Sequence, residues 1–346
     1  MKNAKDVPRF TIVVPVAHSA EDVDRCLASM QKLDYPPDLF RVVLADCGIT
    51  PGPSSRLRNL PPSGPLELHA FALPPAEGKP MGPHMNEYRV NEARNRAIER
   101  FPAEFFAFTE DDCVVPAGWL RKIDGALKDG TGMLGGPDVL PENMSRFNQV
   151  VDAVLNSFLG TAGMRGGGKV PPDRYYPHKE NMVVPSGILD RVGTFPEENF
   201  FGGEMEMADR IRRAGYTVDY MEDNPVVHRR VTTLKNFLVL TAVRASEKIR
   251  LMGKDNPFLK TLRRLVPGAA ALLLILAALS FFAPSVRAVL AGLCAVYFGL
   301  LAIPAVAWAV RKGSPAVGLG VLFVMPLYHG SILLGVLAGI VRGKNT

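Results

Sequence analysis

Acidic side chains stand directly after two apolar runs in this sequence of 346 residues. Asp46 follows Arg41–Ala45, and three consecutive acids at 110–112 follow Glu104–Thr109. Three adjacent carboxylates repel one another, and a divalent cation relieves that repulsion. A solvated loop would relieve it too, but the apolar residues on both sides indicate a turn that emerges from the core. The run therefore predicts a cation site.

Two further groups of ionisable residues lie later in the chain. Glu204 and Glu206 precede Met207–Tyr216, a helical pattern that ends at a glycine cap. Carboxylates at positions i and i+2 point to different sides of a helix, so one shared role is not expected. His228 follows an apolar pair. Taken alone, acids at a helix start suit the helix dipole, and a lone histidine is usually structural.

Strands and helices alternate in the first half of the chain. The predicted strands are Phe10–Val16, Arg41–Ala45, Leu66–Leu73 and Glu104–Thr109, and a helix is predicted over Asn86–Phe101. Short connections between alternating elements indicate an α/β fold with a mostly parallel sheet flanked by helices. Ligands of such sheets bind outside the carboxyl ends of the strands. Asp46 and the acids at 110–112 fall at that edge.

The charge distribution separates the chain into parts. The net charge is +6, yet residues 229–264 carry +8 and residues 265–346 carry +5, which leaves −7 for residues 1–228. Basic residues beside an apolar tail are typical of a membrane surface, and an acidic main part excludes a nucleic-acid partner. We therefore expect a first domain at 1–230, basic amphipathic linker helices at 231–264 and a membrane domain at 265–346. A linker helix packed on the first domain is the alternative.

Three apolar segments are long enough to cross a bilayer as helices. They are residues 265–283, 286–310 and 314–341. Pro326 leaves open whether the third is one kinked helix or a re-entrant pair. More basic residues flank the side of the first domain, and the N-terminus has no signal peptide. The sequence therefore predicts an integral protein of a bacterial inner membrane with its first domain in the cytoplasm.

Taken in order, these segments resemble the inverting family 2 glycosyltransferases, whose catalytic domain has the GT-A fold. The resemblance covers about residues 9–228. Its motifs are TIVVPV, LADCG, ARN, FTEDDCVVPAGWL, NMVVPSGILDRVGTF, GGEMEMADRIRRAGY and the final His228. The chain departs from the family pattern at Cys47 and Gly203, where acids are usual, and at Glu110 and Glu204, where aspartates are usual.

The resemblance implies a role for each matched residue. Asp112 and His228 would bind the metal, Mn²⁺ or Mg²⁺, and the histidine favours Mn²⁺. Glu204 would be the catalytic base, with Glu206 as the alternative. The residues implied to bind the nucleotide sugar are Pro15, Val16, Ala17, Asp46, Arg94, Glu110 and Asp111.

The expected activity is inverting transfer of a sugar from a nucleotide-diphosphate donor to a lipid or lipid-linked acceptor. One alternative is a processive polysaccharide synthase, but those carry a Gln-x-x-Arg-Trp segment. The two tryptophans here, Trp119 and Trp308, have no such context. Another alternative is a catalytically inactive membrane scaffold that binds nucleotide sugars, against which the retained Asp112, Glu204 and His228 argue.

Overall fold

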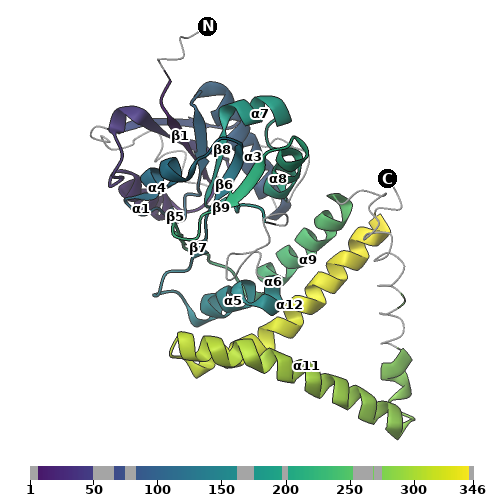
Figure 1. The fold of residues 1–346 in the computed structure, drawn as a ribbon. Helices are drawn as coiled ribbons and strands as arrows, with labels where there is room; N and C mark the ends of the chain where they lie inside the picture. Colours follow the sequence, from purple (N-terminus) through teal and green to yellow (C-terminus); the bar gives the residue numbers. More distant parts are fainter. Residues whose placement is uncertain are drawn as a thin grey trace. The chain divides into compact units, whose positions relative to one another are not determined.

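The computed structural model describes residues 7–49, 66–74, 83–161, 175–196, 202–251, 268 and 275–342. Its internal contacts form two units (Figure 1). The first comprises residues 1–143 and 164–230, and the second comprises residues 144–163 and 231–346. Residues 144–163, which the sequence pattern placed inside the first domain, thus group with the C-terminal helices.

A seven-stranded sheet forms the centre of the first unit. Its strands, in spatial order, are β3 (Glu67–Ala72), β2 (Phe40–Asp46), β1 (Phe10–Val16), β4 (Phe105–Phe108), β8 (Met182–Pro185), β6 (Thr131–Gly135) and β9 (Thr217–Tyr220). All neighbours are parallel except β8, which runs antiparallel to both β4 and β6. The predicted α/β fold with a mostly parallel sheet is confirmed.

Helices cover both faces of this sheet. They are α1 (Ala20–Met30), α3 (Pro83–Arg100), α4 (Trp119–Ala126), α7 (Ser186–Val192) and α8 (Gly203–Arg213). Alternate residues of a strand point to opposite faces. Ile12 and Val14 of β1 accordingly pack in one cluster with residues of α1 and α4, whereas Val13 packs in another with residues of α3, α7 and α8. This two-sided burial explains why the strand is apolar throughout.

A second, three-stranded sheet has the order β5 (Cys113–Val114), β10 (Val226–His228) and β7 (Asp138–Val139). β10 runs antiparallel to β5 and parallel to β7. In this register His228 pairs with Cys113, and Val226 pairs with Asp138. The small sheet therefore brings together residues that lie about a hundred positions apart in the chain.

The described residues of the second unit form helices. It contains α5 (Arg146–Asn156), α6 (Phe158–Thr161), α9 (Leu234–Leu251), α11 (Pro284–Arg311) and α12 (Pro315–Arg342). α12 contacts α5, α9 and α11. A Cβ atom at Gly335 or Gly339 would collide with the backbone of α9, so small residues allow these two helices to approach closely.

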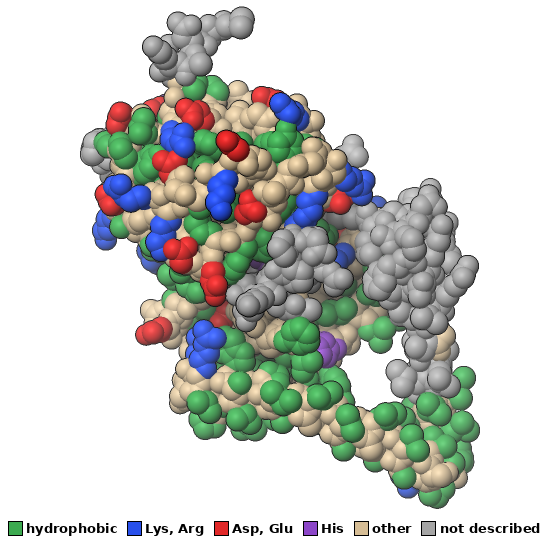
Figure 2. Space-filling view, viewed as in Figure 1, with side chains coloured by type: hydrophobic (Ala, Val, Ile, Leu, Met, Phe, Trp, Pro, Cys, Tyr) green, Lys and Arg blue, Asp and Glu red, His purple; other side chains and the backbone are tan. Residues whose placement is uncertain are grey.

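Two helices of the described residues are long and apolar enough to cross a membrane, Pro284–Arg311 and Pro315–Val341. They correspond to the second and third predicted spans, and α12 is one continuous helix through Pro326. The first predicted span, 265–283, lies mostly outside the described residues, as do residues 252–264 of the predicted linker. Figure 2 shows hydrophobic side chains exposed along α11, where Val289, Ile303 and others have more than half of their surface exposed.

Candidate active site

Asp111 joins the carboxyl ends of β1 and β4. Its Oδ2 accepts hydrogen bonds from the backbone N–H groups of Ala17, at 2.9 Å, and His18, at 2.8 Å. Its Oδ1 lies 2.6 Å from His18 Nδ1. Burial disfavours the charged imidazole, but the hydrogen bond to Asp111 and the nearby acids outweigh it and raise the pKa of His18 to about 9. The sequence pattern did not single out His18.

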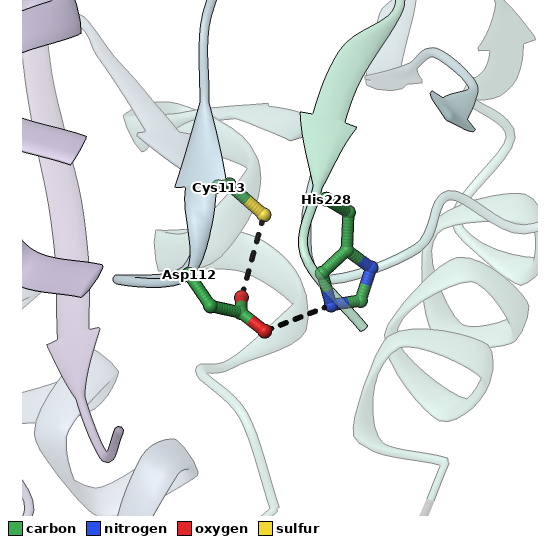
Figure 3. A group of neighbouring side chains, drawn as sticks. All are labelled: Asp112, Cys113 and His228. Carbon is green, nitrogen blue, oxygen red and sulfur yellow. Dashed lines mark hydrogen bonds and ion pairs between the residues drawn. The ribbon is translucent and has the colours of Figure 1, made fainter. Parts of the chain in front are cut away.

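Asp112, directly before β5, and His228, at the end of β10, form a buried pair (Figure 3). His228 Nε2 lies 3.2 Å from Asp112 Oδ2, and the Cys113 thiol lies 3.7 Å from Asp112 Oδ1. Burial opposes charge on both groups, yet their attraction prevails. It raises the pKa of His228 to about 10 and lowers the pKa of Asp112 well below its usual range. The two residues predicted to bind the metal are therefore in contact.

Two acids that the sequence pattern missed lie on the other side of His228. Asp138 Oδ2 is 3.1 Å from His228 Nδ1, and Glu180 Oε1 is 3.6 Å from the same nitrogen. Burial would raise the pKa of Glu180, but the charge of His228 lowers it to about 2. Glu180 precedes β8, and because β8 is antiparallel its start lies at the edge where β4 ends. Glu180 could therefore be predicted as a site residue only if the direction of β8 in the sheet were known.

Arg94 connects two further predicted residues. Its guanidinium has no exposed surface and lies 3.6 Å from Glu110 Oε1 and 3.7 Å from Glu204 Oε1. Lys179 Nζ also lies 2.9 Å from Glu110 Oε1. Burial raises the pKa of Glu110, and the charge of Lys179 opposes the rise. Arg94 is therefore placed to hold these two acids, and its predicted contact with a nucleotide stays a prediction.

The remaining predicted residues lie at or near the same edge. Asp46 pairs in register with Val16 and is buried, and its Oδ1 accepts a hydrogen bond of 2.8 Å from the Gly48 N–H. Glu206 Oε1 lies 3.8 Å from Arg210 on its own helix, α8. Glu204 and Glu206 therefore differ in their surroundings, because Glu204 lies near Arg94 whereas Glu206 lies near Arg210.

Several side chains of the described residues could hold a metal ion. Three groups have ligand atoms within 4.8 Å of one another: Asp112 with Cys113 and His228, His18 with Asp111 and Asp112, and Glu110 with Glu180 and His228. Glu180 Oε2 is buried without a hydrogen-bond partner, which is a position that a cation or water satisfies. Burial raises the pKa of the Cys113 thiol well above its usual value, so oxygen and imidazole donors dominate. This set fits Mn²⁺ or Mg²⁺.

The chain is similar in sequence to a glycosyltransferase. No family model matches the sequence. The chain is 23% identical over 220 residues to the glycosyltransferase AglE of Haloferax volcanii, and that match covers 63% of this chain and 66% of AglE. Part of AglE therefore has no counterpart in the match.

One solved structure shows the same architecture. The mannosyltransferase PcManGT from Pyrobaculum calidifontis, solved in complex with GDP-Man and Mn²⁺, matches with a TM-score of 0.59 at 20% identity. This match covers 92% of the present chain and 87% of PcManGT. TarS of S. aureus, residues 1–349, matches with a TM-score of 0.43 at 16% identity over 71% of this chain and 66% of that one. The chain is thus similar in sequence to a glycosyltransferase and has a GT-A-like fold, with two apolar helices in its C-terminal part.

Proposed function

We propose that the protein transfers a sugar from a nucleotide-diphosphate donor to an acceptor hydroxyl at the carboxyl edge of its sheet. The observation that carries this proposal is the meeting of Asp112 with His228 beside the Glu110–Arg94–Glu204 network. The relation to a glycosyltransferase supports it, and so does the fold shared with a protein solved with GDP-Man and Mn²⁺. In each of these pairs the acidic and basic groups lie within 4 Å of each other, which supports the proposal.

Asp112 and His228 would hold Mn²⁺ or Mg²⁺. When bound, that cation offsets the negative charge that develops on the departing diphosphate. Asp111 holds the Ala17–His18 segment by two backbone hydrogen bonds and so fixes the end of β1. Pro15, Val16 and Ala17 at this strand end, with Asp46 on the adjacent strand, would seat the nucleoside.

Glu204 would accept the proton of the acceptor hydroxyl. The acceptor oxygen forms a bond to the anomeric carbon while the bond to the phosphate oxygen breaks, and the electron pair leaves with the diphosphate. Attack from the opposite face in a single displacement inverts the anomeric configuration. A general base of this kind contributes about 10²–10⁴-fold in rate. Arg94 positions the Glu204 carboxylate, whereas Glu206 lies near Arg210 of the same helix.

The apolar helices would anchor this activity in the cytoplasmic membrane. α11 is almost entirely apolar and exposes most of its side chains, which in water would carry a large hydrophobic cost. Basic residues before position 265 and at Arg311–Lys312 favour a cytoplasmic position for the first unit. Substrates that reach such an enzyme from the bilayer are lipids or lipid-linked sugars, and we propose one of these as the acceptor.

The experiment uses the purified full chain in detergent with GDP- and UDP-sugars, each with and without Mn²⁺. The correct donor should raise the melting temperature, since a ligand at 100 times its Kd stabilises by about 2.7 kcal/mol. The same donor should be hydrolysed slowly in a metal-dependent reaction. Glu204→Gln should abolish transfer and retain donor binding, with Glu206→Gln as the matched control. Failure of every nucleotide sugar to bind or react would reject the proposal, and binding without any turnover would favour a scaffold.

A further inference from the structure

We propose that Asp138 is a positioning residue that fixes the orientation and the tautomer of His228 for metal binding. This inference rests on the function proposed above, in which Asp112 and His228 hold the cation. It concerns the second ring nitrogen of His228, whose partners come from a part of the chain that no motif singled out. In this inference the small sheet positions a metal-binding side chain.

The small sheet brings Asp112, His228 and Asp138 side by side. Asp112 immediately precedes β5, His228 ends the central strand β10, and Asp138 begins β7. Backbone pairing sets His228 opposite Cys113 and Val226 opposite Asp138. Because backbone hydrogen bonds fix these positions, the His228 imidazole lies between the carboxylates of Asp112 and Asp138.

The contacts assign one nitrogen to each carboxylate. Nε2 lies 3.2 Å from Asp112 Oδ2, and Nδ1 lies 3.1 Å from Asp138 Oδ2. An ionised carboxylate only accepts hydrogen bonds, so Asp138 requires the hydrogen on Nδ1. The lone pair of the neutral ring is then on Nε2, on the side of Asp112. Metal-binding histidines are commonly oriented in this way, and loss of such a partner costs 10–100-fold in metal affinity.

Other neighbours of Nδ1 fit this role less well. Glu180 Oε1 lies 3.6 Å away, beyond an ordinary hydrogen bond. The Arg230 guanidinium lies 3.4 Å from Nδ1, but it also pairs with Asp138 Oδ2. A guanidinium only donates, and its pairing with Asp138 accounts for its approach to the ring. Arg230 therefore helps to hold Asp138 in place.

The backbone around Asp138 is anchored independently. The Val226 N–H donates to the Pro137 carbonyl at 3.0 Å, and the Asn181 side chain donates to the same oxygen at 3.2 Å. Asp138 itself is buried. Removing its charge should therefore change the environment of His228 while the local backbone keeps its course, which makes the role testable by substitution.

The test measures binding of Mn²⁺ alone to the full chain by electron paramagnetic resonance. Asp138→Asn should weaken binding about 10–100-fold, and Asp138→Glu should recover part of the loss. The matched control is Asp219→Asn, which removes a carboxylate that accepts hydrogen bonds from Thr131 and Thr217 on the large sheet. In donor hydrolysis, Asp138→Asn should raise the Mn²⁺ concentration needed for half-maximal rate, with little change of the rate at saturating Mn²⁺.

The outcomes separate this inference from the proposed function. If the wild-type chain binds no Mn²⁺, the metal-dependent function fails. If wild type binds and Asp138→Asn binds equally well, the role of Asp138 alone is wrong. Should that variant not fold, nitrogen NMR of ¹⁵N-histidine in the Mg²⁺-loaded wild type decides, with His228→Gln to assign the signal. Hydrogen on Nδ1 supports the inference, and hydrogen on Nε2 overturns it.

Discussion

Replacement of Arg94 by methionine tests whether the buried guanidinium holds the site together. Arg94 has no exposed surface, lies within 4 Å of carboxylates of Glu110 and Glu204, and approaches the Phe195 ring at 5.3 Å. Methionine keeps much of the apolar stem and removes the charge. Glu110 would retain Lys179 as a partner, whereas Glu204 would lose the Arg94 contact.

The expected cost follows from that difference. Removing one partner of a buried ion pair destabilises a protein by about 3–5 kcal/mol. Lys179 still compensates Glu110, and Glu204 is partly exposed, so the lower end, about 3 kcal/mol, applies here. For a unit of about 200 residues each kcal/mol shifts the melting temperature by about 2–4 °C. Arg94→Met should therefore melt about 6–12 °C below wild type.

Trp119 is a convenient reporter because it is buried in the first unit. A Trp308→Phe background removes the only other tryptophan of the chain, so fluorescence then follows the first unit alone. The matched control is Arg96→Met on the same helix, whose half-exposed side chain pairs with Glu99 at 3.2 Å. Exposed pairs contribute about 0–1 kcal/mol, so this control should melt close to wild type. Equal melting of the two variants would refute the reasoning.

Three further predictions concern the metal pair and its support. Because the pKa of His228 is raised to about 10 and only the neutral ring binds a metal, Mn²⁺ binding at pH 8 should release about one proton, measured by calorimetry in buffers of different ionisation enthalpy. Without metal, the charged His228 stabilises the fold, fully so below its unfolded pKa of about 6.5, and this contribution is lost as the pH rises through about 10. The urea midpoint should therefore fall between these two pH values, and it should fall less in His228→Gln. Asn181→Ala removes the side chain that accepts a hydrogen bond from the Trp119 indole N–H and donates one to the Asn224 carbonyl. It should lower the free energy of unfolding in urea by about 2–4 kcal/mol, whereas Asn143→Ala at an exposed position should change it very little.

The fold was largely predictable because its strands are marked by strong local patterns. Phe10–Val16 is buried on both faces and therefore apolar at every position, and the acids at 110–112 follow a similar run. Where a parallel strand ends, the next residues belong to the ligand edge. Asp46, Asp111 and Asp112 could be found by this rule alone.

The part of the site that could not be predicted from the sequence depends on strand pairings between distant segments. Asp138 reaches His228 only through the β7–β10 pairing, and Glu180 reaches it only because β8 runs antiparallel. Neither residue has a local signal, since a single acid beside a proline or a lysine is ordinary on a surface. Helices α5 and α6 likewise join the helical unit through contacts with α12 that no periodicity indicates.

Anomalous diffraction from crystals of the full chain grown with Mn²⁺ and a nucleoside diphosphate tests the central claim most directly. The account predicts one manganese peak about 2.0–2.3 Å from a carboxylate oxygen of Asp112 and from His228 Nε2, with the diphosphate beside it. A manganese peak away from Asp112 and His228, with the nucleotide bound elsewhere, would contradict the account.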